Sequence, residues 1–254
     1  MDLTGNTVLI TGGSAGIGLA LAKKFVELKN DVIITGRTQE KLESAAVAVP
    51  GVDTIRCDAA DVKDIAAMAD RVKKNHPKLN VLVNNAGIFL YKNLSKSGGD
   101  LSALTAEVDI NVSGPIRTVA ALIDLLLQNT GTIVNVSSGL AFVPLPAGPV
   151  YCATKAALHS YTLSLRTQLA EHGVRVIELM PPAVRTDLTA DLPDDAGFKM
   201  MSTDELVAAT VKGLREGRDE IRPGQANQLH WMSRIAPAFI NRQLAKGSKS
   251  LIPE

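Results

Sequence analysis

Short apolar runs alternate with amphipathic stretches from the beginning of the chain. Runs rich in Val, Ile and Leu occur at 7–11, 32–35, 52–57, 81–84, 132–136 and 174–180. Continuous apolar runs of this length are typical of strands that are buried on both faces. Between them, helical patterns occur at 17–29, 39–49, 62–75, 116–128 and 153–170.

Strands separated by single helices predict right-handed βαβ units and therefore a parallel sheet covered by helices on both faces. The 254 residues suffice for one large α/β domain, and no pattern along the chain demands a second hydrophobic core. We therefore expect a single doubly wound α/β domain that spans residues 1–254.

Two later segments do not continue the strand and helix alternation. The stretch 186–202 is polar and turn-rich but carries Phe198 and Met200. It predicts a lid over a ligand, or otherwise a surface loop anchored by its apolar side chains. The stretch 229–246 has apolar residues at helical spacing, interrupted by Pro237. It is expected to pack on a substrate cleft or at a subunit contact; a membrane contact is disfavoured by the near-zero net charge.

Composition and charge narrow the class of protein. Apolar residues make up 46% of the chain and charged residues 21%, and the net charge of +1 indicates neither nucleic acid nor an anionic membrane as a partner. The two cysteines, Cys57 and Cys152, favour a reducing compartment over a disulfide framework. Without a signal-peptide pattern or a bilayer-length apolar run, we expect a cytoplasmic protein. The four histidines show no ligand spacing, so no metal site is expected.

A glycine-rich segment follows the first predicted strand and opens the first helix. It reads Thr-Gly-Gly-Ser-Ala-Gly-Ile-Gly over 11–18, with Gly12, Ser14 and Gly18 as candidate coenzyme contacts. Glycines allow close approach of the backbone, and a helix N-terminus favours phosphate. The alternative is a glycine-rich turn without a ligand, but its position between strand and helix favours a Rossmann-type dinucleotide site.

The end of the second strand bears on the choice of coenzyme. An acidic residue there binds the ribose hydroxyls of NAD, whereas this chain has Gly36 and Arg37. Arg37 can pair with a 2′-phosphate, so NADP(H) is favoured and NAD(H) remains possible. Thr38 either donates to that phosphate or caps the second helix. Asp58 either accepts from an adenine amino group or only ends the third strand.

Tyr151 and Lys155 are four residues apart at the start of a helical stretch. This spacing places both side chains on one helix face. A tyrosine hydroxyl has an ordinary pKa of about 10, and a nearby ammonium favours its deprotonated form. The pair therefore indicates a proton-transferring tyrosine, although the spacing alone occurs by chance in many proteins.

Five motifs occur together in this chain: the segment 11–18, Asn-Asn-Ala-Gly at 84–87, Asn111, Asn-Val-Ser-Ser at 135–138 and Tyr-x-x-x-Lys at 151–155. In this order, and over nearly the whole length, they resemble the short-chain dehydrogenase/reductase family, in its single-domain branch. The run 181–187 and the C-terminal segment resemble the DltE-like oxidoreductases of that family.

The resemblance implies a role for each matching residue. Tyr151 would be the general acid for carbonyl reduction or the base for alcohol oxidation, and Ser138 would polarise the substrate oxygen. Lys155 would lower the pKa of Tyr151 and bind the nicotinamide ribose. Asn111, inside a helix, would hold a water through its backbone carbonyl in a proton relay. Coenzyme contacts are further implied at Ile17, Asn85, Ala86, Gly87, Val184 and Thr186.

The family also implies a homodimer or homotetramer that pairs helices near 116–128 and 153–170. The predicted activity is NADP(H)-dependent carbonyl reduction or alcohol oxidation of a small molecule; the alternatives are an NAD-preferring dehydrogenase or a non-catalytic nucleotide-binding regulator. Two positions depart from the family pattern: Pro182 replaces a glycine, and Ala15 stands where several NADP-dependent relatives have arginine. Residues expected to line an apolar substrate cleft are Phe89, Leu140, Phe142, Val143, Leu145, Phe198 and Met200.

Overall fold

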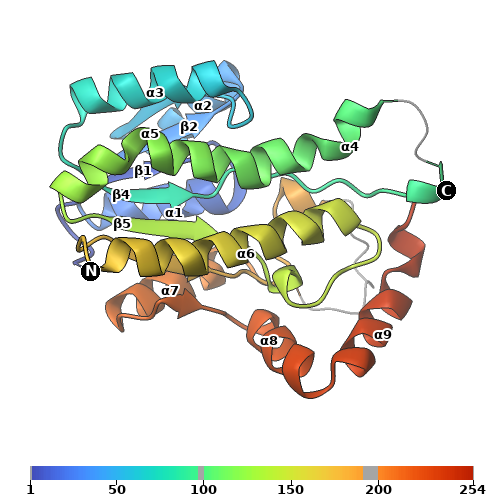
Figure 1. The fold of residues 1–254 in the computed structure, drawn as a ribbon. Helices are drawn as coiled ribbons and strands as arrows, with labels where there is room; N and C mark the ends of the chain where they lie inside the picture. Colours follow the sequence, from blue (N-terminus) through green and yellow to red (C-terminus); the bar gives the residue numbers. More distant parts are fainter. Residues whose placement is uncertain (1, 97–99, 191–199, 254) are drawn as a thin grey trace.

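A parallel sheet forms the centre of the computed structural model, which describes residues 2–96, 100–190 and 200–253 (Figure 1). In these ranges the sheet has seven strands in the order β3-β2-β1-β4-β5-β6-β7. The strands are β1 (Thr7–Ile10), β2 (Asp31–Gly36), β3 (Val52–Arg56), β4 (Leu79–Asn84), β5 (Thr132–Val136), β6 (Arg175–Leu179) and β7 (Glu220–Ile221). The six predicted strands are confirmed; β7, with only two residues, was not predicted.

Helices cover both faces of this sheet. One face carries α1 (Gly16–Glu27), α2 (Gln39–Ala48) and α7 (Thr203–Arg215). The other carries α3 (Val62–Asn75), α5 (Gly114–Gln128) and α6 (Pro149–Ala170). The doubly wound Rossmann-type fold is therefore confirmed.

Alternating side chains of β1 show how the sheet divides two apolar cores. Val8 and Ile10 pack against the α1 and α7 side, whereas Leu9 packs against the α3 and α5 side, and all three are fully buried. Burial of one such aliphatic side chain stabilises the fold by about 1.5–3 kcal/mol. The continuous apolar runs in the sequence follow from these two cores, because most strand residues face one core or the other and are buried there.

The helix across the α3 and α6 side is unusually long. It consists of α4 (Leu101–Val108), a π-helical turn η2 (Asp109–Ser113) and α5. Among the described residues it is the one helix long and apolar enough to cross a membrane, yet half of its most apolar stretch is buried inside the protein. It packs against α3 and α6, as a core helix does.

The C-terminal segment, whose helical spacing Pro237 interrupts, forms two helices: α8 (Gln225–Ile235) and α9 (Pro237–Gly247), with the proline in the first turn of α9. Both lie beyond the carboxyl ends of the strands, and the last residues reach Asn93, whose side chain donates to the Pro253 carbonyl at 2.9 Å (Figure 1). Short 3₁₀ turns are η1 (Leu94–Lys96), η3 (Gly139–Ala141), η4 (Asp187–Thr189) and η5 (Lys249–Leu251). Most of the predicted lid, residues 191–199, lies outside the described residues.

Candidate active site

A cavity of about 970 Å³ opens at the carboxyl ends of the parallel strands. It extends from the glycine-rich loop after β1, past the ends of β4 and β5, to helices α8 and α9. In doubly wound sheets, ligands bind at this edge, where the strand order reverses. Here the reversal lies between β1 and β4.

The loop after β1 is shaped for close approach of a ligand. Gly12 has a φ of 64°, and a Cβ there would lie 2.8 Å from the Ala86 Cα. Gly16 has a φ of 53°, and no side chain caps the first turn of α1. The N–H groups of that turn can therefore receive an anion. These features fit the pyrophosphate of a dinucleotide.

Gly18 supports this loop from behind and does not line the cavity. A Cβ at Gly18 would lie 2.4 Å from the Gly12 carbonyl oxygen and 2.5 Å from the Asn85 amide nitrogen. Its role is thus close packing of α1 on the loop. Of the predicted coenzyme contacts, all others line the cavity: Gly12, Ser14, Ile17, Arg37, Asp58, Asn85, Ala86, Gly87, Tyr151, Lys155, Val184 and Thr186.

Hydrogen bonds join the glycine-rich loop to the end of β4. The Thr11 hydroxyl accepts from the backbone N–H groups of Asn85 at 3.0 Å and Ala86 at 3.1 Å. In return, the Asn85 side-chain amide donates to the carbonyls of Thr11 at 3.0 Å and Gly12 at 3.1 Å. Asn85 therefore braces the loop through its side chain, a contact that the sequence did not reveal.

Two cations line the cavity beyond β2. Arg37 directly follows the strand, and Lys41 lies one helical turn later on α2; both are exposed. Lys41 was missed in the sequence, although its spacing of four from Arg37 was a usable signal. Thr38 starts α2 without a side-chain capping bond, so the capping alternative is not supported. One Asp58 oxygen accepts from the Ala60 N–H at 3.0 Å, so this residue also shapes its own turn.

Tyr151, Ser138 and Lys155 meet at the middle of the cavity. Tyr151 is buried, and burial raises the pKa of its hydroxyl, while a hydrogen bond with Ser138 acts in the opposite direction. Lys155 Nζ lies 5.5 Å from the Tyr151 ring centroid and donates to the Val136 carbonyl at 2.9 Å. Burial lowers the pKa of Lys155 to about 8. The sequence motifs therefore converge on one place, as predicted.

Asn111 lies in the π-helical turn and is fully buried, away from the cavity wall. Pro115, four residues later, has no N–H, so the Asn111 carbonyl lacks the donor it would have in a regular helix. A π-turn of this kind often marks a functional position. The side chain of Asn111 is bonded to the backbone N–H and carbonyl of Ile88 and to the Thr154 hydroxyl.

The other end of the cavity is mostly apolar. Phe89 stacks edge-on against the Tyr151 ring with centroids 4.6 Å apart. Further lining side chains are Tyr91, Leu140, Leu145, Leu229, Met232, Phe239, Ile240 and Leu244. Three predicted cleft residues were wrong. Val143 is fully buried in the fold, and the Phe142 ring packs between His159 and His230. Met200 does not line the cavity either, and Phe198 lies outside the described residues.

Two further features of the site concern cysteine chemistry and metal binding. Cys152, next to Tyr151, is buried, and burial raises the pKa of its thiol to about 11, so the reactive thiolate is suppressed. In the described ranges, no group of three His, Cys, Asp or Glu side chains is placed to hold a metal ion.

Comparison with known proteins agrees with this geometry. The family model for short chain dehydrogenases matches residues 6–197. The chain is 46% identical over 224 residues to the uncharacterized oxidoreductase DltE of Bacillus subtilis, covering 87% of this chain and 89% of that protein. It is 27% identical to a fatty acyl-CoA reductase of Mycobacterium tuberculosis, over 100% of this chain and 88% of that protein.

A solved structure shows the same fold. A short chain dehydrogenase from Burkholderia cenocepacia, in complex with NADP, superposes with a TM-score of 0.84 and 28% identity, covering 96% of this chain and 99% of that one. The matched family model covers most of the chain and includes the loop at 11–18, Ser138, Tyr151 and Lys155. The protein therefore belongs to the short-chain dehydrogenase family of oxidoreductases.

Proposed function

We propose that the protein is an NADP(H)-dependent carbonyl reductase, or alcohol dehydrogenase in the reverse direction, acting on apolar substrates. The observation that carries this proposal is the meeting of Ser138, Tyr151 and Lys155 in one cavity with the glycine-rich loop. Two hydroxyl groups and an ammonium group beside a dinucleotide-binding loop can exchange a proton with a carbonyl or alcohol oxygen.

A nicotinamide coenzyme would be held by the loop after β1, by Ala86 and Gly87 after β4, and by Val184 and Thr186 after β6. When bound, it supplies or accepts the hydride. The positive φ angles at Gly12 and Gly16 and the uncapped first turn of α1 support this fit.

Tyr151 acts on the substrate oxygen. Burial raises the pKa of its hydroxyl, so the residue is protonated at neutral pH and is ready to donate a proton as negative charge develops on a carbonyl oxygen. Ser138 supplies a second hydrogen-bond donor to the same oxygen. In alcohol oxidation both groups act in reverse, and the positive charge of Lys155 favours the phenolate of Tyr151.

The proton lost by Tyr151 must be replaced from solvent. Lys155 is close to Gly87 and to Asn111: a Cβ on Gly87 would lie 3.6 Å from Lys155 Nζ and 3.2 Å from the Asn111 side-chain oxygen. The Asn111 carbonyl, deprived of its helical partner by Pro115, would hold a water next to Lys155. We assign Lys155 and this water to the proton relay.

Arg37 and Lys41 support NADP(H) over NAD(H), because both line the cavity where the ribose 2′-phosphate would lie and no acidic residue occupies the end of β2. The NADP complex of the Burkholderia cenocepacia relative is in line with this choice.

The apolar lining from Phe89 to α9 supports a substrate with an aliphatic or aromatic body attached to the carbonyl. The resemblance to a fatty acyl-CoA reductase points to the same class of substrate. Exposed apolar side chains on α5 and α6, Ile116 and Leu163, support pairing of these helices in a homodimer or homotetramer. The two buried cysteine thiols agree with a cytoplasmic location.

The deciding experiment measures coenzyme oxidation with NADPH and with NADH against a panel of straight-chain aldehydes, ketones and quinones. We expect turnover with apolar carbonyls, a higher kcat/KM with NADPH, and a loss of at least about 100-fold in kcat for Tyr151→Phe. Unchanged turnover in Tyr151→Phe would remove the assignment of the proton donor. Tight NADPH binding without turnover of any carbonyl would instead favour a nucleotide-binding regulator.

A further inference from the structure

A buried carboxylate lies below the proposed catalytic groups and has no part in the mechanism described so far. Glu178, on β6, has no exposed surface. One of its oxygens accepts from the Ser137 hydroxyl, and the other pairs with His159 Nδ1 at 2.8 Å. Burial of an ionisable group is costly, so a buried carboxylate with two dedicated partners calls for a reason.

His159 extends the row of functional residues on α6. Tyr151, Lys155 and His159 are spaced by four, so they lie on one face of the helix, which is turned toward the sheet. The His159 side chain is 21% exposed, whereas Glu178 and Lys155 are buried. The pKa of His159 is raised by its hydrogen bond to Glu178. The row therefore leads from the catalytic tyrosine to solvent.

Ser137 links the carboxylate to the catalytic strand end. Its hydroxyl donates to Glu178, its N–H donates to the Leu179 carbonyl at 2.9 Å, and its neighbour in the chain is Ser138. Val136, on its other side, accepts the hydrogen bond from Lys155 Nζ at 2.9 Å. Through its bond to Ser137, Glu178 thus holds the strand end between Val136, which contacts Lys155, and Ser138, which would contact the substrate oxygen.

Glu178 is also the acidic group whose charge acts on Lys155. Burial lowers the pKa of Lys155, and the Glu178 carboxylate acts in the opposite direction. The other charged groups near this pair face His159: Arg166 on α6 and Glu220 on β7. Arg222 and Arg234 face His230 beyond the Phe142 ring, and Glu107 on α4 faces Tyr151.

We propose that Glu178 is a positioning residue: held by Ser137 and His159, it is the internal counter-charge that keeps Lys155 as an ammonium during the reaction. The proposal builds on the proposed function, since it assigns the electrostatic support of the same proton relay. The negative charge of Glu178 stabilises the ammonium of Lys155, and its hydrogen bonds fix the strand end that carries Ser138.

The substitution Glu178→Gln separates charge from hydrogen bonding. Glutamine has the same shape, accepts from Ser137 through its oxygen and donates to the neutral His159 ring through its nitrogen. Ser137→Ala does the reverse, because it removes a hydrogen bond and leaves the charge. Glu220→Gln is the matched control, since it removes a carboxylate from the adjacent strand that faces His159 and not Lys155.

The first measurement needs neither coenzyme nor substrate. The protein is labelled with ¹³C at lysine Cε, the Lys155 resonance is assigned with Lys155→Met, and its chemical shift is followed with pH. We expect the titration midpoint of Lys155 to fall by about one pH unit in Glu178→Gln, and to stay unchanged in Ser137→Ala and Glu220→Gln. An unchanged midpoint in Glu178→Gln would overturn the proposal.

The second measurement is the pH profile of kcat/KM for reduction of a substrate found in the panel. The decrease toward high pH, where Lys155 loses its proton, should begin about one pH unit lower in Glu178→Gln and return toward the wild-type profile in Glu178→Asp. A purely structural role would lower the rate at every pH without moving the profile, which also contradicts the proposal. If the Lys155 resonance shifts but no carbonyl is reduced by the wild type, the proposed function fails and the counter-charge stands.

Discussion

The side-chain amide of Asn111 binds the backbone of Ile88 on both sides of its Cα, accepting from its N–H and donating to its carbonyl, both at 2.9 Å. The same amide donates to the Thr154 hydroxyl at 3.0 Å, which in turn donates to the Tyr151 carbonyl at 2.7 Å. One asparagine therefore ties the segment after β4 to the helix turn that carries Tyr151.

Asn111→Ala removes these bonds and leaves the partly buried N–H and carbonyl of Ile88 without this partner. We expect the free energy of unfolding to fall by about 2–4 kcal/mol and kcat to fall at least tenfold, as measured by urea denaturation and steady-state kinetics. Asn129→Ala is the control, because Asn129 also donates to two carbonyls, of Pro77 and Leu79, but far from the cavity. It should lose stability and keep its kcat; equal losses of kcat in both variants would argue against a specific role for Asn111.

Gly18→Ala tests the packing of α1 on the glycine-rich loop. Its Cβ would lie 2.4 Å from the Gly12 carbonyl oxygen, so the loop must move. We expect the Kd for NADPH, measured by calorimetry, to rise at least tenfold, together with a loss of about 1–3 kcal/mol in stability. Lys23→Ala, an exposed change on the same helix, should alter neither quantity. Wild-type affinity in Gly18→Ala would mean that the loop tolerates the displacement.

Arg37 and Lys41 should share the recognition of the 2′-phosphate. Each single alanine variant is expected to raise the KM for NADPH about five- to twentyfold and to leave the KM for NADH nearly unchanged, because only NADPH carries the phosphate. Arg56→Ala serves as the control, since Arg56 is a comparable exposed cation at the end of β3 that does not line the cavity. A fall in affinity for both coenzymes alike would show that the two cations bind another part of the dinucleotide.

The buried Lys155 should make stability depend on pH. Burial lowers its pKa from 10.5 to about 8, so between these values the unfolded chain binds more protons than the folded protein. The free energy of unfolding contributed by Lys155 therefore increases with pH across this window, by an amount on the order of 3 kcal/mol, and is lost as the pH falls through 8. Tyr151, whose pKa is raised, acts in the opposite direction above pH 10.

The measurement is chemical denaturation at several pH values between 8 and 10. The rise in the free energy of unfolding should be smaller in Lys155→Met than in the wild type, because methionine has no proton to exchange. Parallel curves for the two proteins would show that Lys155 is not desolvated in solution.

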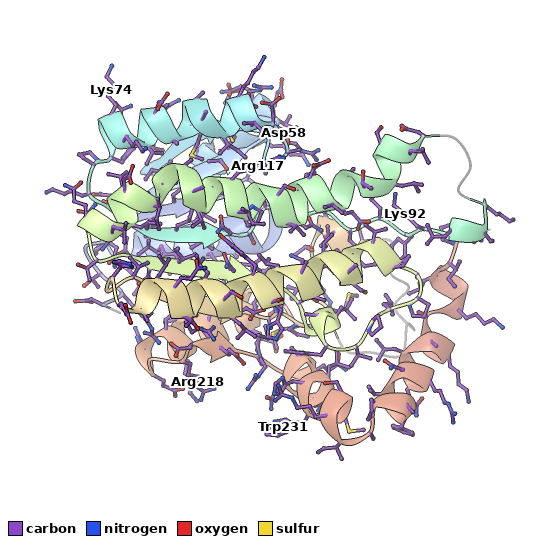
Figure 2. The ribbon with its side chains drawn as sticks, viewed as in Figure 1. Asp58, Lys74, Lys92, Arg117, Arg218 and Trp231 are labelled. Atoms are coloured by element: carbon purple, nitrogen blue, oxygen red, sulfur yellow. The ribbon has the colours of Figure 1, made fainter. Side chains whose placement is uncertain are left out.

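Phe239, on α9, lines the apolar end of the cavity although its side chain is 55% exposed. Phe239→Ser should lower kcat/KM for long-chain aldehydes about tenfold and leave short aldehydes unaffected, because only long chains reach that wall. Ile235→Ser is the matched control, since Ile235 is 75% exposed on the adjoining helix and does not line the cavity. Trp231→Ser is a second control, because Trp231 does not line the cavity either and projects from α8 away from the strands (Figure 2).

The sheet was predictable because burial on both faces leaves a continuous apolar run in each strand. The helix α7 was not predicted, although Ser202 and Glu205 form a capping box at its start, which is a recognisable local signal. The strand β7 pairs through only two residues, too few to leave a pattern. An element can thus be predicted from the local sequence when it is long enough for its buried residues to form a pattern.

Among the site residues, those with a chemical motif were predictable and those that act through tertiary contacts were not. Tyr151 and Lys155 are marked by their spacing, and Gly12 by its place after a strand. Glu178 is an acidic residue within an apolar strand, but its partners Ser137 and His159 lie 41 and 19 residues away along the chain. Val143 was wrongly assigned to the cleft, because an apolar residue in a loop has the same appearance whether it faces a cavity or the core.

The bracing of the glycine-rich loop joins residues 74 positions apart, since Thr11 is bonded to Asn85. During synthesis on the ribosome, β1, β2 and β3 can associate as soon as they emerge, but this loop lacks its brace until β4 has followed. The Tyr151 helix emerges later still. Contacts of such long range slow folding, and the edge of β1 that pairs with β4 stays exposed in the nascent chain until β4 has emerged. Coenzyme affinity should therefore arise late in biosynthesis, only after the second half of the sheet has joined the first.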